Sequence, residues 1–296
     1  MDRPAKWNVL VDGDTLVYKC AFVAEKRMYR LMYNGVAAYE AKLKSDIKKF
    51  LATYDGPDLV EVKETWVEPL SYSIQACKTT LMALQAALAP YDEFRVFLSD
   101  PDTPDFRVTG ATIKPYKGNR VEMTKPVYYH QLREYMFEYW GAELVSGMEA
   151  DDMLGIEQND NSVIVTMDKD LYQVPGWHYN WTDAEPPFYI PQHEADRWKW
   201  VQCLCGDSTD NIEGIPGLGS AGAIKLLQNV EDELLEEAVR DIYEDYFSST
   251  KKVRGKPYSL ADYAEQLGMT AHEIMEENLM LVTILQERPD VSPASA

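Results

Sequence analysis

Short apolar runs alternate with segments of helical periodicity along much of the chain. The apolar runs at 7–12, 94–100 and 162–168 each end in aspartate. Continuous short runs of this kind are typical of strands that are buried on both faces of a parallel sheet. Helical patterns lie between them, at 71–89 and 126–140. The alternation predicts βαβ units and an α/β fold with a mostly parallel central sheet flanked by helices.

Acidic residues gather at the ends of these predicted strands. Because parallel strands share one carboxyl edge, Asp12, Asp100 and Asp168 are expected to project into the same crevice, although an aspartate after a strand is often only a helix cap. Six further acids stand close to such positions, namely Glu149, Asp151, Asp152, Asp170, Asp207 and Asp210. Converging carboxylates repel one another unless cations are present. All-oxygen ligation therefore indicates Mg²⁺ or Mn²⁺.

The first strand end allows a second interpretation. Asp12-Gly13-Asp14-Thr15 matches the Asp-x-Asp-x-Thr motif of haloacid-dehalogenase-like phosphatases, in which the first Asp is a nucleophile and the second a general acid. This interpretation leaves Glu149, Asp151, Asp168 and Asp170 largely unused.

The charge of the chain is strongly uneven. The 296 residues carry a formal net charge of −20, which argues against a generally basic nucleic-acid wrapper, and 46% hydrophobic residues exclude wholesale disorder. Residues 107–133 nevertheless hold six cations against the single acid Glu122. Cations interleaved with aromatic rings suit a strand of nucleic acid, and a solvated loop and helix face is the alternative. The candidate DNA contacts in this stretch are Arg107, Lys114, Lys125 and Tyr128.

A glycine-rich turn follows the last acidic motif. It contains Gly217-x-Gly219-x-x-Gly222, but a dinucleotide site needs a preceding strand, and a helix is predicted at 194–205 instead. A helix–glycine turn–helix offers backbone N–H groups to phosphates, and Lys225 adds a cation.

Several classes of protein and site are unexpected from the sequence. No apolar run reaches the length of a membrane span, and the N-terminus lacks the apolar segment of a secretory signal. The four cysteines and four histidines show no zinc-ligand spacing, so buried thiols in a reducing compartment are expected.

Taken together, the motifs resemble the 5′-nuclease (flap endonuclease) family. They occur in the family's order across residues 8–228: Val-Asp-Gly-Asp at 11–14, Asp100, Tyr-Lys-Gly-Asn-Arg at 116–120, Glu-Ala-Asp-Asp at 149–152, Asp-Lys-Asp at 168–170 and Gly-Asp-Ser-Thr-Asp-Asn-Ile-x-Gly-Ile-Pro-Gly-Leu-Gly from 206. The length and Gly-Met-Thr-Ala-His-Glu-Ile at 268–274 are most similar to the stand-alone 5′→3′ exonucleases of tailed bacteriophages.

The resemblance implies a site with two Mg²⁺ or Mn²⁺ ions. It assigns one ion to Asp12, Asp100, Glu149 and Asp151, and the second to Asp152, Asp168, Asp170 and Asp210, with Asp207 nearby. It also implies that Lys117 and Arg120 neutralise the phosphate in the transition state.

The resemblance further implies a division of the chain. Residues 1–200 form a PIN/5′-nuclease-like α/β core that includes a helical arch at 117–148. Residues 201–296 form a mostly helical region with a DNA-binding helix–three-turn–helix near 206–228, which often holds K⁺ in the family. Segments 25–70 and 229–296 have no assigned role.

The expected function is that of a divalent-metal-dependent 5′→3′ exodeoxyribonuclease with flap or nick endonuclease activity. It would act as a monomer in phage DNA replication and primer removal, in the cytoplasm of a bacterial host. Its partners would be DNA with a 5′ end, nick or flap, RNA–DNA hybrids and replication proteins, without a membrane. The alternatives are the phosphatase that uses Asp12 and Asp14, and a non-catalytic DNA-end-binding protein of the same fold.

Overall fold

The chain divides into two compact units in the computed structural model. Unit 1 comprises residues 1–15, 85–124 and 141–296, and unit 2 comprises 16–84 and 125–140. The structure describes residues 3–121, 123–183, 185–253 and 255–289, so Glu122 of the basic stretch and the end of the chain lie outside the described residues. The boundary at residue 200 and the arch at 117–148 stay predictions.

Unit 1 is built on a six-stranded sheet of order β6–β5–β1–β7–β8–β9. The strands are β1 (Trp7–Asp12), β5 (Tyr91–Ser99), β6 (Glu143–Val145), β7 (Ser162–Val165), β8 (Gly176–Tyr179) and β9 (Phe188–Ile190). The first five in this order run parallel, and β9 is antiparallel to β8. The strands predicted at 7–12 and 94–100 are confirmed, whereas the third ends at Val165, three residues earlier than expected. The mostly parallel sheet confirms the α/β class.

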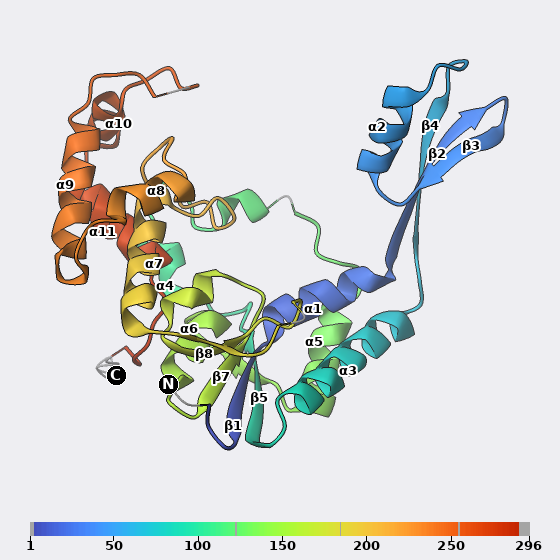
Figure 1. Cartoon of the computed structure of the whole chain (residues 1–296), viewed down its shortest axis with the longest axis horizontal. Helices are drawn as coiled ribbons and strands as arrows, with labels where there is room; N and C mark the ends of the chain where they lie inside the picture. Colours follow the sequence, from blue (N-terminus) through green and yellow to red (C-terminus); the bar gives the residue numbers. More distant parts are fainter. Residues whose placement is uncertain (1–2, 122, 184, 254, 290–296) are drawn as a thin grey trace. The chain divides into compact units, whose positions relative to one another are not determined.

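The helices of unit 1 form two groups, one on the central sheet and one in the part of the chain after residue 191 (Figure 1). On the sheet, Leu154 of α6 (Ala150–Glu157) packs in one core with Leu10 and Ile164. Further along the chain come α7 (Gln192–Cys205), α8 (Ser220–Leu227), α9 (Leu235–Phe247), α10 (Leu260–Leu267) and α11 (Ala271–Val282). The helix predicted at 194–205 is thereby confirmed as α7. The Tyr243 hydroxyl links α9 to α7 and α11. It donates to the Cys203 carbonyl of α7 (2.6 Å) and accepts from Asn278 Nδ2 of α11 (3.1 Å).

Unit 2 combines helices with a second, antiparallel sheet. Its helices α3 (Leu70–Ala87) and α5 (Tyr129–Trp140) confirm the helices predicted at 71–89 and 126–140, and α1 (Gly13–Ala21) ends in this unit. The sheet has the order β3–β2–β4, with β2 (Glu25–Tyr33), β3 (Val36–Ala41) and β4 (Val60–Val67). α2 (Lys44–Thr53) covers one face of this sheet, where Ile47 packs on Tyr29 and Leu31. None of the described helices has the length and apolar composition needed to cross a bilayer.

Candidate active site

The strand-end aspartates lie at one edge of the central sheet. β5, β1 and β7 are adjacent and parallel, so Asp12, Asp100 and Asp168 share their carboxyl edge. Asp12 is fully buried, and its carboxylate accepts hydrogen bonds from Thr15 N (3.1 Å), Thr15 Oγ1 (2.7 Å) and Thr166 Oγ1 (2.8 Å). Burial raises the pKa of Asp12 to about 6. The sequence prediction missed both threonines, although the Asp-x-x-Thr spacing at 12–15 was a signal for the first.

The first turn of α6 presents the second group of acids. Glu149 is the N-cap residue, and its backbone N–H donates to Asp152 Oδ2 (3.0 Å) in a capping box. Ala150 N donates to Ser99 Oγ (2.8 Å), which fixes the start of α6 to the end of β5. Burial, followed by the charges of Asp12, Asp168 and Glu149, raises the pKa of Asp151 well above its ordinary value.

Arg107 of α4 (Phe106–Gly110) lies inside the protein, although it was predicted to contact DNA. Only 3% of it is exposed, and its guanidinium donates to both oxygens of Asp152 (2.7 Å each) and to the carbonyls of Leu281 (3.0 Å) and Thr283 (2.5 Å). Asp152, predicted as a metal ligand, is fully buried and also accepts from Leu285 N (3.0 Å). The Arg107 guanidinium and the Asp152 carboxylate thus neutralise each other in the protein interior, so neither is available to DNA or to a metal ion.

Two of the predicted motifs dock on each other through hydrogen bonds. We call residues 115–120 the basic loop and residues 206–211 the acidic turn. The bonds are Lys117 N to Asp210 O (2.8 Å), Asn119 Nδ2 to Ser208 O (2.8 Å), Arg120 Nε to Thr209 O (3.1 Å) and Asn211 Nδ2 to Pro115 O (2.9 Å). Lys117 and Asn211 both adopt left-handed backbone conformations, with φ of 54° and 64°. Such values are uncommon outside glycine and mark conformations that the surrounding contacts impose.

This docking places the predicted catalytic cations against carboxylates. The Tyr116 hydroxyl donates to Asp210 Oδ2 (2.9 Å) and lies 3.2 Å from Glu149 Oε2. Lys117 pairs with Glu149 and lies 3.5 Å from Asp210, and Arg120 pairs with Asp210. Burial opposes the charged form of Lys117, but its two acidic neighbours outweigh burial and raise its pKa. Tyr116 was missed as a site residue, although it precedes Lys117 in the motif.

The remaining acids lie between the strand β7 and the acidic turn. Asp170 accepts from Gln202 Nε2 (2.5 Å), and its backbone N–H donates to Asp168 Oδ1 (3.0 Å). Burial, followed by the charges of Asp168, Asp207 and Asp210, raises the pKa of Asp170 to about 8. The pKa of Asp168 is also raised, mainly by burial. Asp168 and Asp170 are therefore both buried and close to other carboxylates.

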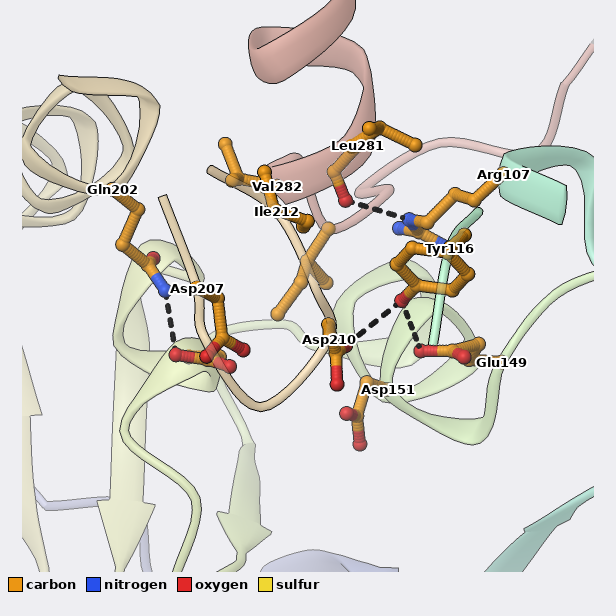
Figure 2. Close-up of a pocket in the computed structure, with 12 residues that line it drawn as sticks. Arg107, Tyr116, Glu149, Asp151, Gln202, Asp207, Asp210, Ile212, Leu281 and Val282 are labelled. Atoms are coloured by element: carbon orange, nitrogen blue, oxygen red, sulfur yellow. Dashed lines mark hydrogen bonds between the residues drawn. The ribbon is translucent and has the colours of Figure 1, made fainter. Parts of the chain in front are cut away.

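A small cavity collects five of the predicted carboxylates. It has a volume of about 30 Å³, enough for one or two water-sized species. Figure 2 shows the Tyr116 hydroxyl between the carboxylates of Asp210 and Glu149. The acids that line the cavity are Glu149, Asp151, Asp170, Asp207 and Asp210.

The donor chemistry of this cavity fits a hard divalent cation. All five acids offer oxygen ligands. Burial first, and neighbouring carboxylates second, raise the pKa values of Asp151 and Asp170, and a bound cation would stabilise their charged forms. Among the described residues, no three His, Cys, Asp or Glu side chains are arranged so that they could hold one ion together. The acids therefore surround the cavity without forming a closed ligand shell.

The glycine turn between α7 and α8 depends on close backbone contact. Ile215 N donates to Leu204 O (2.8 Å), and a Cβ on Gly214 would lie 2.3 Å from the backbone nitrogen of Gly206. Gly206 and Gly214 both have positive φ, so the turn requires glycine at these two positions. Of the predicted DNA contacts in this region, Gly217 also has positive φ, Gly219 caps α8, and Gly222 and the exposed Lys225 lie on α8.

The other predicted site residues lie in different surroundings. Asp100 accepts from Ser146 Oγ (2.8 Å), and Lys114 pairs with Glu213 (2.7 Å) in unit 1. Lys125 and Tyr128 belong to unit 2, where the Lys125 ammonium lies 4.5 Å from the centre of the Tyr129 ring and Tyr128 is half-buried.

Known proteins resemble the chain in sequence and in fold. No family model matches it. It is 28% identical to the exodeoxyribonuclease of Enterobacteria phage T3 over 56% of this chain and 60% of that protein. It is 31% identical to the exonuclease of Escherichia phage T7 over 35% of this chain and 38% of that one, and 32% identical to DNA polymerase I of Bacillus subtilis (strain 168) over 52% and 19%. The matches thus span at most about three fifths of these relatives.

Solved structures agree on the fold. A flap endonuclease of bacteriophage T5, solved in a pseudo-enzyme-product complex with DNA and metal ions, has a TM-score of 0.52 at 16% identity and covers 94% of this chain and 89% of its own. The T5 5′-exonuclease with bound zinc has a TM-score of 0.50 at the same identity and coverage. The predicted fold class is confirmed by these neighbours and by the sheet topology.

Proposed function

We propose, from the premise that the chain is related to phage 5′-nucleases in sequence and in fold, that it is a divalent-metal-dependent 5′→3′ exonuclease with flap endonuclease activity on DNA. The observation that carries this proposal is the set of five carboxylates around one small cavity, with Lys117 and Arg120 beside them. Carboxylates for divalent cations next to cations for phosphate suit phosphodiester hydrolysis.

We assign the divalent ions, Mg²⁺ or Mn²⁺, to the acids of the cavity. Two ions are implied by the resemblance, with Asp12, Asp100 and Asp168 contributing from the sheet edge. When bound, the ions supply positive charge and Lewis acidity for hydrolysis of the phosphodiester. Asp152 takes a different role in this proposal, because both of its oxygens accept from Arg107. It holds the first turn of α6, and thereby Glu149 and Asp151, in place.

Lys117 and Arg120 provide the phosphate-binding charge of the site. Both lie on the basic loop, where Lys117 pairs with Glu149 and Arg120 pairs with Asp210. A bound phosphate would compete with these carboxylates for the two cations. The Tyr116 hydroxyl joins Glu149 and Asp210 from the same loop, so the loop orients acids and cations together. Fixed charges of this kind stabilise a negatively charged transition state without reorganisation.

The phosphatase alternative leaves most of the acidic site without a role. It uses Asp12 and Asp14, whereas Glu149, Asp151, Asp170, Asp207 and Asp210 line the small cavity. Asp14 accepts a hydrogen bond from Ser99 N (3.0 Å), so it supports the junction of α1 with β5.

Cleavage of 5′-labelled DNA tests the proposal directly. Purified protein with Mg²⁺ is expected to release mononucleotides or short oligonucleotides from blunt, nicked, gapped and flapped duplexes, and excess EDTA is expected to abolish the activity. Binding without any product in Mg²⁺ or Mn²⁺ would favour the non-catalytic DNA-end-binding protein. Activity that persists in EDTA would refute the metal dependence.

Three further measurements test the finer parts of the proposal. We infer a role in phage DNA replication and primer removal in a bacterial host, with a K⁺ ion at the glycine turn. RNA–DNA hybrids cleaved at rates close to those of DNA duplexes would support primer removal. A monomer measured by light scattering would support the proposed oligomeric state, and cleavage that is independent of K⁺ would count against the K⁺ site.

A further inference from the structure

Unit 2 contains a cavity of its own, lined mainly by residues of segment 25–70, which has no assigned role. It has a volume of about 480 Å³, within the range of ligand pockets. It lies where β2 pairs with β4 alone, from Glu25 opposite Val67 to Met28 opposite Glu64, whereas β3 joins β2 only from Tyr29 onwards. Seven of the nine residues that line the cavity therefore lie on these two strands, and Phe22 and Val127 complete the lining.

Three cations outnumber the acids in the lining of this cavity. Lys26, Arg27 and Lys63 belong to the lining, and none of them makes an ion pair within the described part of the chain. The one acid of the lining is Glu25, and its carboxylate accepts a hydrogen bond from Val127 N (2.8 Å). A concentration of positive charge in a chain of net charge −20 is complementary to an anionic ligand.

Two exposed aromatic residues also belong to the lining of the cavity. Phe22 is 49% exposed and Trp66 is 44% exposed. The Trp66 indole N–H donates to Glu68 Oε1 (3.0 Å), which limits the rotation of the ring. Trp66 and Lys26 are directly opposite each other on neighbouring strands, so a ring and a cation stand side by side.

We propose that this cavity binds a segment of single-stranded DNA, with backbone phosphates on Lys26, Arg27 and Lys63 and a base stacked on Trp66. Cations that follow a backbone, interleaved with rings that take bases, are the general arrangement for single strands, because only unpaired bases expose their faces. A duplex offers phosphates alone and leaves the rings unused. The choice of DNA as the polymer rests on the proposed function, whereas the cationic and aromatic lining does not.

Binding of a fluorescein-labelled oligothymidylate to the full-length protein in EDTA tests the proposal. The triple variant Lys26→Ala, Arg27→Ala, Lys63→Ala is expected to bind at least about ten-fold more weakly. The slope of log affinity against log salt is expected to fall by about 2, since three phosphate contacts are lost. Trp66→Ala is expected to weaken binding at least about five-fold through lost stacking.

Matched variants control for net charge and for exposed aromatic area. Lys42→Ala, Lys48→Ala, Lys78→Ala removes the same charge from exposed positions of unit 2 outside the cavity lining, and Tyr33→Ala removes an equally exposed ring. Both controls are expected to bind as the wild type does. Equal losses in the cavity variants and their controls would overturn the proposal. So would cavity-dependent binding of poly-glutamate or phosphatidylserine vesicles without binding of the oligonucleotide.

The oligonucleotide-binding test and the cleavage test can fail separately. If the wild type fails to cleave DNA in Mg²⁺ while the triple variant loses oligonucleotide binding, the proposed function fails and the cavity proposal stands. If the wild type cleaves and the triple variant binds the oligonucleotide unchanged, the cavity proposal fails and the proposed function stands.

Discussion

The buried ion pair of Arg107 and Asp152 supports the first turn of α6. Arg107 contacts both oxygens of Asp152 and two backbone carbonyls near the end of the described chain, at Leu281 and Thr283. Removing one partner of such a pair leaves the other charge buried and unpaired, which costs far more than the pair itself contributes. The position of Glu149 and Asp151 therefore depends on Arg107, whose charge is paired with Asp152 inside the protein.

Arg107→Ala is expected to lower the free energy of unfolding by roughly 3–5 kcal/mol, measured by urea denaturation. Lys114→Ala is the control, because Lys114 pairs with Glu213 at a more exposed position and should cost about 1 kcal/mol or less. If Arg107 contacts DNA, its variant would instead keep wild-type stability and show a smaller salt dependence of DNA binding.

His178 makes the stability of the fold dependent on pH. It is buried, its Nε2 lies 2.7 Å from the Val174 carbonyl, and burial lowers its pKa to about 4. Because the folded pKa lies below the unfolded value of 6.5, the unfolded chain binds more protons, and stability falls as pH drops from about 6.5 to about 4. The contribution is roughly 3 kcal/mol at the acid end.

His178→Gln is expected to flatten the pH dependence of unfolding in this window relative to the wild type. Urea denaturation at pH values between 4 and 7 measures it. Parallel stability curves for the two proteins would contradict the assignment, since the carboxylates titrate in both.

Individual residues also mark the limit of sequence-based prediction. The charge of Arg107 and its place in the basic stretch favour a DNA contact, but its partner Asp152 is 45 positions away, and no periodicity reveals their pairing. Asp12, Asp100 and Asp168 were easier to place, because each lies at or shortly after the end of a strand and parallel strands share one carboxyl edge.

At the scale of elements, the site depends on the docking of the basic loop on the acidic turn. The two segments are about ninety positions apart and are joined mainly by bonds to backbone carbonyls. Such bonds leave no side-chain pattern, so the sequence predicted the two motifs but not their contact. The strands β1, β5 and β7 were predictable because they are short apolar runs. β4 was not, because all of its residues are exposed and its composition is mixed.

Asn211 separates two contributions to this docking. Its side chain donates to the Pro115 carbonyl, and its backbone is left-handed. Asn211→Gly keeps the left-handed conformation and loses the hydrogen bond, whereas Asn211→Ala loses both advantages. We expect the single-turnover cleavage rate to fall in the order wild type, Gly variant, Ala variant, with a loss of about ten-fold or more for Ala, because misplaced catalytic groups cost rate steeply. Equal rates in all three proteins would show that the docking does not position the site.

At the scale of the whole molecule, the net charge of −20 is not spread evenly. Part of it is concentrated in the cavity acids of unit 1, while three cations belong to the lining of the cavity of unit 2. An acidic protein can therefore bind DNA at defined places while its general surface repels it. From this distribution of charge we expect weak DNA binding that becomes stronger when divalent cations are added.

The rate of cleavage of a 5′-labelled flap duplex by Asp151→Asn tests the central claim most directly. The control is Asp160→Asn, which changes an exposed acid after α6 that does not line the cavity. In saturating Mg²⁺, the Asp151 variant is expected to cleave about 100-fold more slowly or worse, with duplex binding retained, while the control cleaves at the wild-type rate. Wild-type cleavage by the Asp151 variant would contradict the account.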